Sequence, residues 1–156
     1  AGQNQKYLYD QLVYFVNGER ENALMTAVIP YLKTLSSDEL FDIAAFYAES
    51  SASVGQADSD VDLLALGESL YRAGDLSRGI PACTACHSLY GEGNIQAGFP
   101  KISGQQKGYL ISTLKEYRSQ SRNAGNYALV MQAASANLKD NDIEALANYM
   151  HGLYRK

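Results

Sequence analysis

Two cysteines and a histidine near the middle of the chain have the spacing C-x-x-C-H: they are Cys83, Cys86 and His87. This spacing is the attachment signature of a c-type haem, whose vinyl groups form thioethers with the two thiols. On one helical turn, positions i, i+3 and i+4 share a face, so the three side chains can reach one edge of a porphyrin. We therefore predict that Cys83 and Cys86 attach a haem and that His87 ligates its iron.

Other uses of these three residues are weaker. A structural zinc site needs four protein ligands, and the only further Cys or His is His151. A thioredoxin-like dithiol needs a βαβ context, and no segment of the chain has a strand pattern. A disulfide between residues three apart would be strained and would leave the adjacent His87 unexplained. Haem attachment is the interpretation that uses all three residues.

A low-spin electron carrier also needs a second axial ligand, and a methionine sulfur raises the reduction potential because it favours the reduced iron. Two methionines follow the motif. Met150 falls on an apolar stripe with helical spacing, so we expect it to pack in the core. Met131 lies in the connection before that helix, far enough from His87 to reach the opposite haem face. We expect Met131 to be the sixth ligand, with core packing as its alternative.

The second ring nitrogen of His87 must be held so that the tautomer and the ring angle are fixed. A carbonyl of the loop after the motif can accept that proton, and Pro100 stiffens the right stretch. His151 precedes Gly152 near the chain end, where a solvated histidine at a helix terminus is expected. Ligation of the haem is the alternative for His151.

The composition excludes some partners. The 156 residues carry a formal net charge of −4, which argues against a nucleic-acid partner. No apolar run approaches membrane-spanning length. Residues 1–50 carry three basic and seven acidic side chains. This asymmetry could orient a docking partner, although ordinary solvated helix faces explain it equally well.

The chain contains two related segments, which a shift of about one hundred residues brings into alignment. Between them, residues 51–60 are small, polar and without periodicity, which predicts a linker. We predict a partial unit without its own C-x-x-C-H in residues 1–50 and a haem-binding domain in residues 61–156. The aligned pairs include Gly2 with Gly104, Tyr7 with Tyr109, Leu12 with Leu114, and Arg20 with Arg122.

The expected secondary structure is helical throughout. Polar and acidic residues at 37–39 and 140–142 predict helix N-termini. Glycines and Pro100 between residues 91 and 104 predict loops. The fold class is therefore all-α, with long loops around a cofactor. Helical periodicity is found in residues 7–15, 61–73 and 109–117.

These residues resemble the second domain of the dihaem cytochrome c4 family. The matching stretches are residues 66–72, 80–87, 98–105 and 117–122, and Met131 continues the match. The resemblance covers essentially the whole chain. It implies a class I cytochrome c domain preceded by a related, N-terminally incomplete cytochrome c-like unit. It also implies a periplasmic carrier, not an enzyme, that passes single electrons toward a terminal oxidase.

The resemblance implies a role for each candidate site residue. Cys83 and Cys86 hold one haem c covalently. His87 and Met131 ligate its iron, and the Pro100 carbonyl accepts a hydrogen bond from His87. The implied partners are redox proteins: a terminal oxidase and an upstream reductase or dehydrogenase. Peripheral association with a membrane is compatible with this role.

The first unit departs from the family pattern. A cytochrome c4 first domain carries its own C-x-x-C-H, and this sequence starts after that point. Met25 resembles the axial methionine of that domain, but its spacing to the next aligned leucine is ten residues instead of seven. We expect either a fragment whose head and second haem are missing or a one-haem variant. The fragment is favoured because half a core would expose Tyr7, Leu12 and Phe15.

Two other functions remain open at this point. One is an electron-accepting subunit of a dehydrogenase complex such as a flavocytochrome, in which the acidic first unit contacts the catalytic partner. The other is a ligand-sensing or peroxidatic haem protein, which requires an open iron site. Export is expected in each case, because c-type haem is attached outside the cytoplasm.

Overall fold

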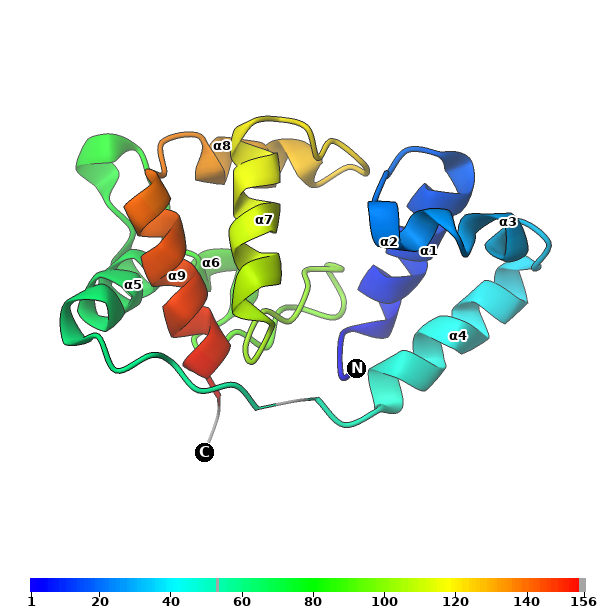
Figure 1. Cartoon of the computed structure of the whole chain (residues 1–156), viewed down its shortest axis with the longest axis horizontal. Helices are drawn as coiled ribbons and strands as arrows, with labels where there is room; N and C mark the ends of the chain where they lie inside the picture. The colour runs from blue at the N-terminus through cyan, green and yellow to red at the C-terminus, as the bar shows by residue number, and fades with distance from the viewer. Residues whose placement is uncertain (53, 155–156) are drawn as a thin grey trace.

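The computed structural model describes residues 1–52 and 54–154. Residue 53, in the predicted linker, and residues 155–156, at the end of the predicted haem domain, lie outside the described residues. The described part is built from helices and two isolated β-bridges, without a strand (Figure 1). The all-α prediction is confirmed.

The first helix group consists of α1 (Gln5–Asn17), α2 (Ala23–Thr26), α3 (Ile29–Leu32) and α4 (Ser37–Glu49). Helices α1 and α4 pack along each other. Helix α4 begins at the predicted position, and Ser36 caps it: the Ser36 Oγ accepts from the Glu39 N–H at 3.3 Å, and the Glu39 carboxylate accepts from the Ser36 N–H at 2.7 Å. This reciprocal pair satisfies two backbone donors that the first turn leaves free.

The second helix group contains the candidate haem site. Its most extensive packing contact joins α5 and α9, and α7 packs against both α8 and α9. The core of this group is a single apolar cluster that includes Ile80, Leu114, Leu146 and Met150. The elements are α5 (Val61–Ala73), the 3-10 helix η1 (Leu76–Arg78), α6 (Thr84–His87), α7 (Lys107–Arg118), α8 (Ala128–Ser135) and α9 (Asp140–Gly152).

Helices α5 and α9 cross with their backbones in contact at Gly67. A Cβ atom at this position would lie 2.2 Å from the Ala145 carbonyl oxygen and 2.8 Å from the Tyr149 Cβ. Next to the crossing, the rings of Tyr71 and Tyr149 lie 5.3 Å apart. Only glycine permits this approach, so residue 67 sets the distance between the two helices that carry the core.

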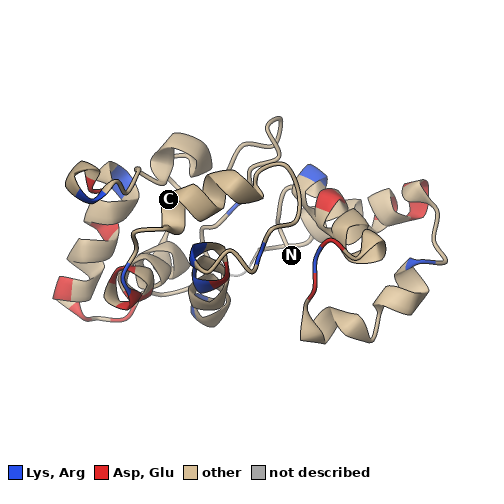
Figure 2. Ribbon diagram, turned by 90° about the horizontal axis from the view of Figure 1, so that it is seen from above, with Lys and Arg blue, Asp and Glu red and all other residues tan. Residues whose placement is uncertain are grey.

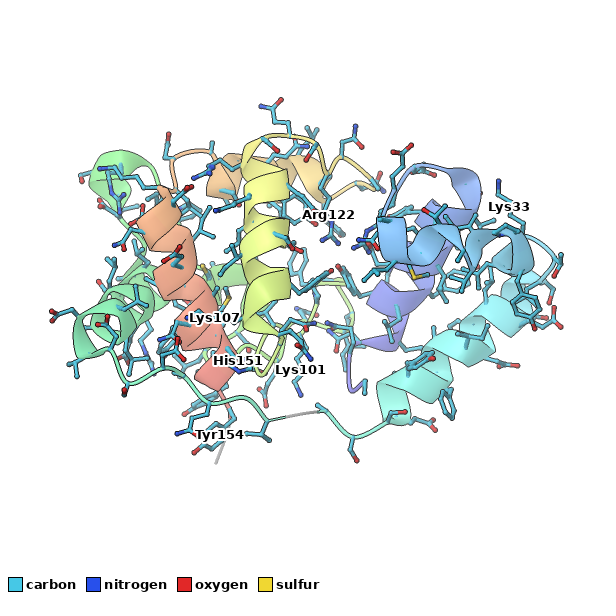
Figure 3. All side chains as sticks on the ribbon, viewed as in Figure 1. Lys33, Lys101, Lys107, Arg122, His151 and Tyr154 are labelled. Atoms are coloured by element: carbon cyan, nitrogen blue, oxygen red, sulfur yellow. The ribbon has the colours of Figure 1, made fainter. Side chains whose placement is uncertain are left out.

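The two helix groups meet through polar contacts between repeat-related residues. Arg122 is buried and donates to the Tyr7 hydroxyl at 2.9 Å, and Arg20 donates to the Tyr109 hydroxyl at 3.2 Å. Figure 3 shows Arg122 beside α7, facing the first group. Nearby, the side chain of Gln3 donates to and accepts from the backbone of Lys101, at 2.7 and 2.6 Å. The groups therefore share a defined junction.

This junction corrects one expectation about the first unit. Half a core was expected to expose the apolar face of Tyr7, Leu12 and Phe15, but Phe15 is buried and the Tyr7 hydroxyl accepts from Arg122. The exposed apolar side chains of this group lie on α2, α3 and α4 instead, where a cavity of about 740 Å³ opens. Leu12 and Met25 line this cavity together with Phe46.

The predicted linker runs along the C-terminal part of α9 instead of standing free. The Asp58 N–H donates to the Asn148 side chain at 2.8 Å, and Gly55 packs directly against His151. The Nδ1 atom of His151 lies 2.8 Å from the Gln105 carbonyl oxygen. His151 lies in the last turn of α9, as expected, but its side chain is half-buried between two backbone segments and not fully solvated.

We predict that Gly67→Ala lowers the free energy of unfolding of the holoprotein by about 2–3 kcal/mol, because the new methyl group must push α5 away from the backbone of α9. Gly108→Ala is the matched control, since a Cβ there meets nothing within 4 Å. It should raise helix stability by up to about 1 kcal/mol. Guanidinium unfolding followed by circular dichroism measures both variants. Equal stability for the two would contradict the close approach at Gly67.

Candidate haem site

Both cysteines and the histidine of the motif lie on a single turn. Helix α6 carries Cys86 and His87, and Cys83 is its N-cap. The His87 N–H donates to the Cys83 carbonyl at 2.9 Å, and this hydrogen bond closes the turn that carries the three side chains. Both cysteines are free thiols. The turn therefore presents two thiols and one imidazole together.

The state of Cys83 argues against the redox alternative. Burial raises the pKa of this thiol to about 11, so Cys83 is not the activated thiolate that a redox dithiol requires. Among residues 1–52 and 54–154, no three His, Cys, Asp or Glu side chains are grouped as metal ligands.

The imidazole of His87 is buried and oriented by one hydrogen bond. Its Nδ1 atom lies 2.9 Å from the Pro100 carbonyl oxygen, and the residue is 6 % exposed. Because a carbonyl can only accept, Nδ1 carries the proton and Nε2 keeps its lone pair. Burial lowers the pKa of His87, and the bond to Pro100 opposes that change only in part. The ring is thus neutral, in the tautomer that ligates a metal through Nε2.

The loop after the motif brings Pro100 to His87. The Gly93 N–H donates to the His87 carbonyl at 3.0 Å, and a bridge joins Asn94 to Phe99. Gly93 has φ +76°, and a Cβ there would lie 2.6 Å from the Pro100 carbonyl oxygen. A glycine is therefore required where the loop folds back under the imidazole.

The segment before the motif is fixed to the start of α9. Arg78 donates to Asp75 at 2.6 Å within this segment and to Asp142 at 2.7 Å on α9. Asp142 also accepts from the Lys139 N–H at 2.8 Å, which caps α9. Burial alone would raise the pKa of Asp142, but the hydrogen bonds from Arg78 and Lys139 outweigh it and lower the pKa. The ion pair thereby positions the chain that leads to Cys83.

Met131 lies within α8, a helix in a stretch where the sequence predicted a connection. Its side chain is partly buried against the core cluster. Its neighbours Leu129 and Val130 are exposed, at 73 % and 49 %. Met150 is 3 % exposed in the core, as predicted.

The residues present fit a covalently bound haem. Two thiols lie three residues apart on one turn, and the buried ring of His87 uses only Nδ1 to bond a protein group of the described chain. A thioether at Met131 is available on a separate element of the same helix group. Cys83 and Met131 both pack against the apolar core cluster of this helix group, which is the kind of surroundings that a porphyrin needs.

The chain is similar in sequence and in structure to known cytochromes c. The family model for cytochrome c matches residues 64–153. The chain is 40% identical over 154 residues to cytochrome c4 of Pseudomonas aeruginosa, a match that covers 99% of this chain and 74% of the relative. It is 33% identical over 153 residues to a thiosulfate dehydrogenase electron acceptor of Thiomonas intermedia, covering 96% and 67%. The crystal structure of reduced recombinant cytochrome c4 from Pseudomonas stutzeri superposes with a TM-score of 0.89 at 40% identity, covering 99% of this chain and 83% of that one.

We predict that Asp142→Asn destabilises the holoprotein by about 2–3 kcal/mol at pH 7, since Arg78 loses a buried carboxylate partner. The folded-state pKa of Asp142 is lowered, so its contribution is complete above the ordinary value of 3.8 and is lost as the pH falls through the folded-state pKa. The difference between wild type and variant should therefore shrink below about pH 4. Urea unfolding between about pH 2.5 and 7 measures it.

Asp140→Asn is the control for this prediction. The Asp140 carboxylate is exposed, and its loss should matter much less. A stability difference for Asp142→Asn that stays constant down to the acid end of the titration would disprove the ion-pair assignment.

Proposed function

Because the chain belongs to the cytochrome c4 family, we propose that Cys83 and Cys86 attach its haem c and that the protein carries single electrons between redox partners in the periplasm. Electron transfer and a covalent haem c follow from the family; the residue roles, the compartment and the partners are proposed. The observation that supports the residue roles best is the buried imidazole of His87, oriented by Pro100 at 2.9 Å with its Nε2 lone pair free.

The haem iron supplies a reversible one-electron couple, and the side chains of this protein set its potential. His87 ligates through Nε2, and its Nδ1–H bond to Pro100 increases the donor strength of the imidazole. Met131 would supply a thioether as a second ligand, which would favour the ferrous state. With both side chains ligating, the iron would have no open position for a substrate. This closed coordination supports a carrier instead of an enzyme.

We propose the domain division that the sequence predicts. Residues 61–156 form the haem-binding cytochrome c domain, residues 1–50 form a partial cytochrome c-like unit, and residues 51–60 link them. The family match to residues 64–153 and the packing of α5 with α9 support the first assignment. The packing of α1 with α4 supports the second.

The proposed acceptor is a terminal oxidase, reached by transient docking. Weak redox encounters use small interfaces, and the exposed Leu129 and Val130 beside Met131 offer such an apolar patch on α8. Acidic and basic residues occur in both helix groups, with no single-sign face in the view of Figure 2. In the described part of the chain, none of the helices has the length and apolarity needed to span a bilayer.

A second candidate is the role of electron acceptor for a dehydrogenase. It is favoured by the similarity to the thiosulfate dehydrogenase electron acceptor of Thiomonas intermedia, at 33% identity. The excess of acidic over basic residues in positions 1–50 would favour the approach of a basic partner.

We predict that Met131→Ala removes the sulfur-to-iron absorption band near the red end of the ferric spectrum and lowers the midpoint potential, because water or no ligand replaces the thioether. Met150→Ala is the matched control: it should cost about 2–5 kcal/mol of stability through a core cavity but keep the band. Met25→Ala should change neither the absorption band nor the midpoint potential. Retention of the band in Met131→Ala would assign the sixth ligand to another residue.

The partner is tested with the reduced holoprotein. Bacterial membranes that contain a terminal oxidase should oxidise it in a cyanide-sensitive reaction, with rates that fall as salt screens the encounter. In the parallel assay, the oxidised holoprotein is mixed with purified thiosulfate dehydrogenase and thiosulfate, and its reduction is measured. Fast reduction there without oxidation by the membranes would favour the dehydrogenase role over the oxidase role.

A further inference from the structure

The residue directly after the haem-ligand histidine has a backbone that serine rarely adopts. Ser88 has φ 68° and ψ 168°, a combination found almost only at glycine. Within residues 1–52 and 54–154, Gln120 is the other non-glycine residue with positive φ. A strained residue persists only where its surroundings hold it, and such residues collect at functional sites.

The group that holds Ser88 is the hydroxyl of Tyr71. It donates to the Ser88 carbonyl at 2.7 Å, whereas the Gly91 N–H, which donates to the same oxygen, lies at 3.4 Å. The Ser88 Oγ in turn accepts from the Glu92 N–H at 3.0 Å. The shortest hydrogen bond to the backbone of Ser88 thus comes from a different helix, seventeen residues earlier in the chain.

Tyr71 is itself one of the most firmly placed side chains of the protein. It is 0% exposed on α5, four residues after Gly67 and on the same face, and its ring packs against Tyr149. Burial raises the pKa of the phenol, so the hydroxyl keeps its proton and remains a donor. The hydroxyl of Tyr71 therefore links the α5–α9 crossing to the backbone beside His87 by one hydrogen bond.

We propose that Tyr71 is a positioning residue for His87: its hydroxyl holds the strained Ser88 peptide and so fixes the direction in which the imidazole meets the haem iron and the Pro100 carbonyl. Without this bond, Ser88 would relax toward negative φ, and the His87 peptide would turn with it. The Nδ1–Pro100 bond would lengthen, and the imidazole would become a weaker donor to ferric iron. This inference rests on the proposed ligation of the iron by His87.

The test is Tyr71→Phe in the matured holoprotein, which keeps the ring and removes only the oxygen. A weaker imidazole donor destabilises the ferric state, so the redox equilibrium should move toward the reduced form by about threefold to tenfold, where tenfold corresponds to about 59 mV. The ferric low-spin electron paramagnetic resonance signal should shift or broaden. Tyr149→Phe is the matched control, because its hydroxyl accepts from Arg72 at 3.2 Å, outside the motif. It should leave the potential and the signal unchanged.

A second set of variants tests the strain directly. In a Ser88→Gly background the positive φ is not strained, so the backbone should not relax when the hydrogen bond is lost. Tyr71→Phe should therefore shift the redox equilibrium much less than in the wild-type background. Gln120→Gly, which relieves the other positive φ, should leave the potential unchanged. Ser88→Val, which keeps Tyr71 and increases the strain, should shift the potential in the same direction as Tyr71→Phe. Ser88→Val also tests the proposal if the Tyr71→Phe variant does not attach its haem.

The proposal is overturned if Tyr71→Phe and Ser88→Val keep the wild-type potential and signal, even if they lower stability, because Tyr71 would then be only a packing residue. An equal effect of Tyr71→Phe in the wild-type and Ser88→Gly backgrounds would also overturn it. Failure of the proposed function looks different: the wild-type holoprotein itself would then lack a reversible one-electron wave.

Discussion

The candidate site depends on the backbone contact between α5 and α9 at Gly67. This crossing fixes Tyr71 on one side, and the Tyr71 hydroxyl reaches the Ser88 carbonyl directly after His87. On the other side it fixes α9, whose Asp142 holds Arg78 in the segment before Cys83. The single turn of α6 is too short to position itself, since isolated turns are unstable in water. Both of its flanks are instead fixed to the same pair of helices.

The junction between the helix groups is made by polar side chains. Its repeat-related arginines and tyrosines bond one another directly, with hydroxyls and not carboxylates as the acceptors. Burial raises the pKa of Tyr7 to about 12, with Arg122 opposing it. Burial would also raise the pKa of Tyr109, but Arg122 and Arg20 outweigh it and lower the value to about 8. The groups are thus joined by directional hydrogen bonds, whereas the second helix group is held by apolar packing.

Much of this arrangement could be predicted from local sequence. The C-x-x-C-H spacing predicted a covalent haem c, which membership of the cytochrome c4 family confirms, and the apolar stripe in residues 143–150 predicted the burial of Met150. The partial burial of His151 was not predicted because its partners, Gly55 and the Gln105 carbonyl, are distant in sequence. The contact between Tyr71 and Ser88 was missed for the same reason, although the spacing of Tyr71 from Gly67 was a usable signal. Periodicity identifies a buried ring, but it cannot say what the hydroxyl of that ring meets.

The proposed role as a carrier depends on ligation of the haem iron by both His87 and Met131, which would leave no open coordination position. Addition of carbon monoxide to the ferrous holoprotein tests it most directly, since the gas binds only where a coordination position is open. We expect the visible spectrum of the ferrous protein at neutral pH to stay unchanged. An immediate shift of the main haem absorption band would show an open iron and would contradict the assignment of an electron carrier with two protein ligands.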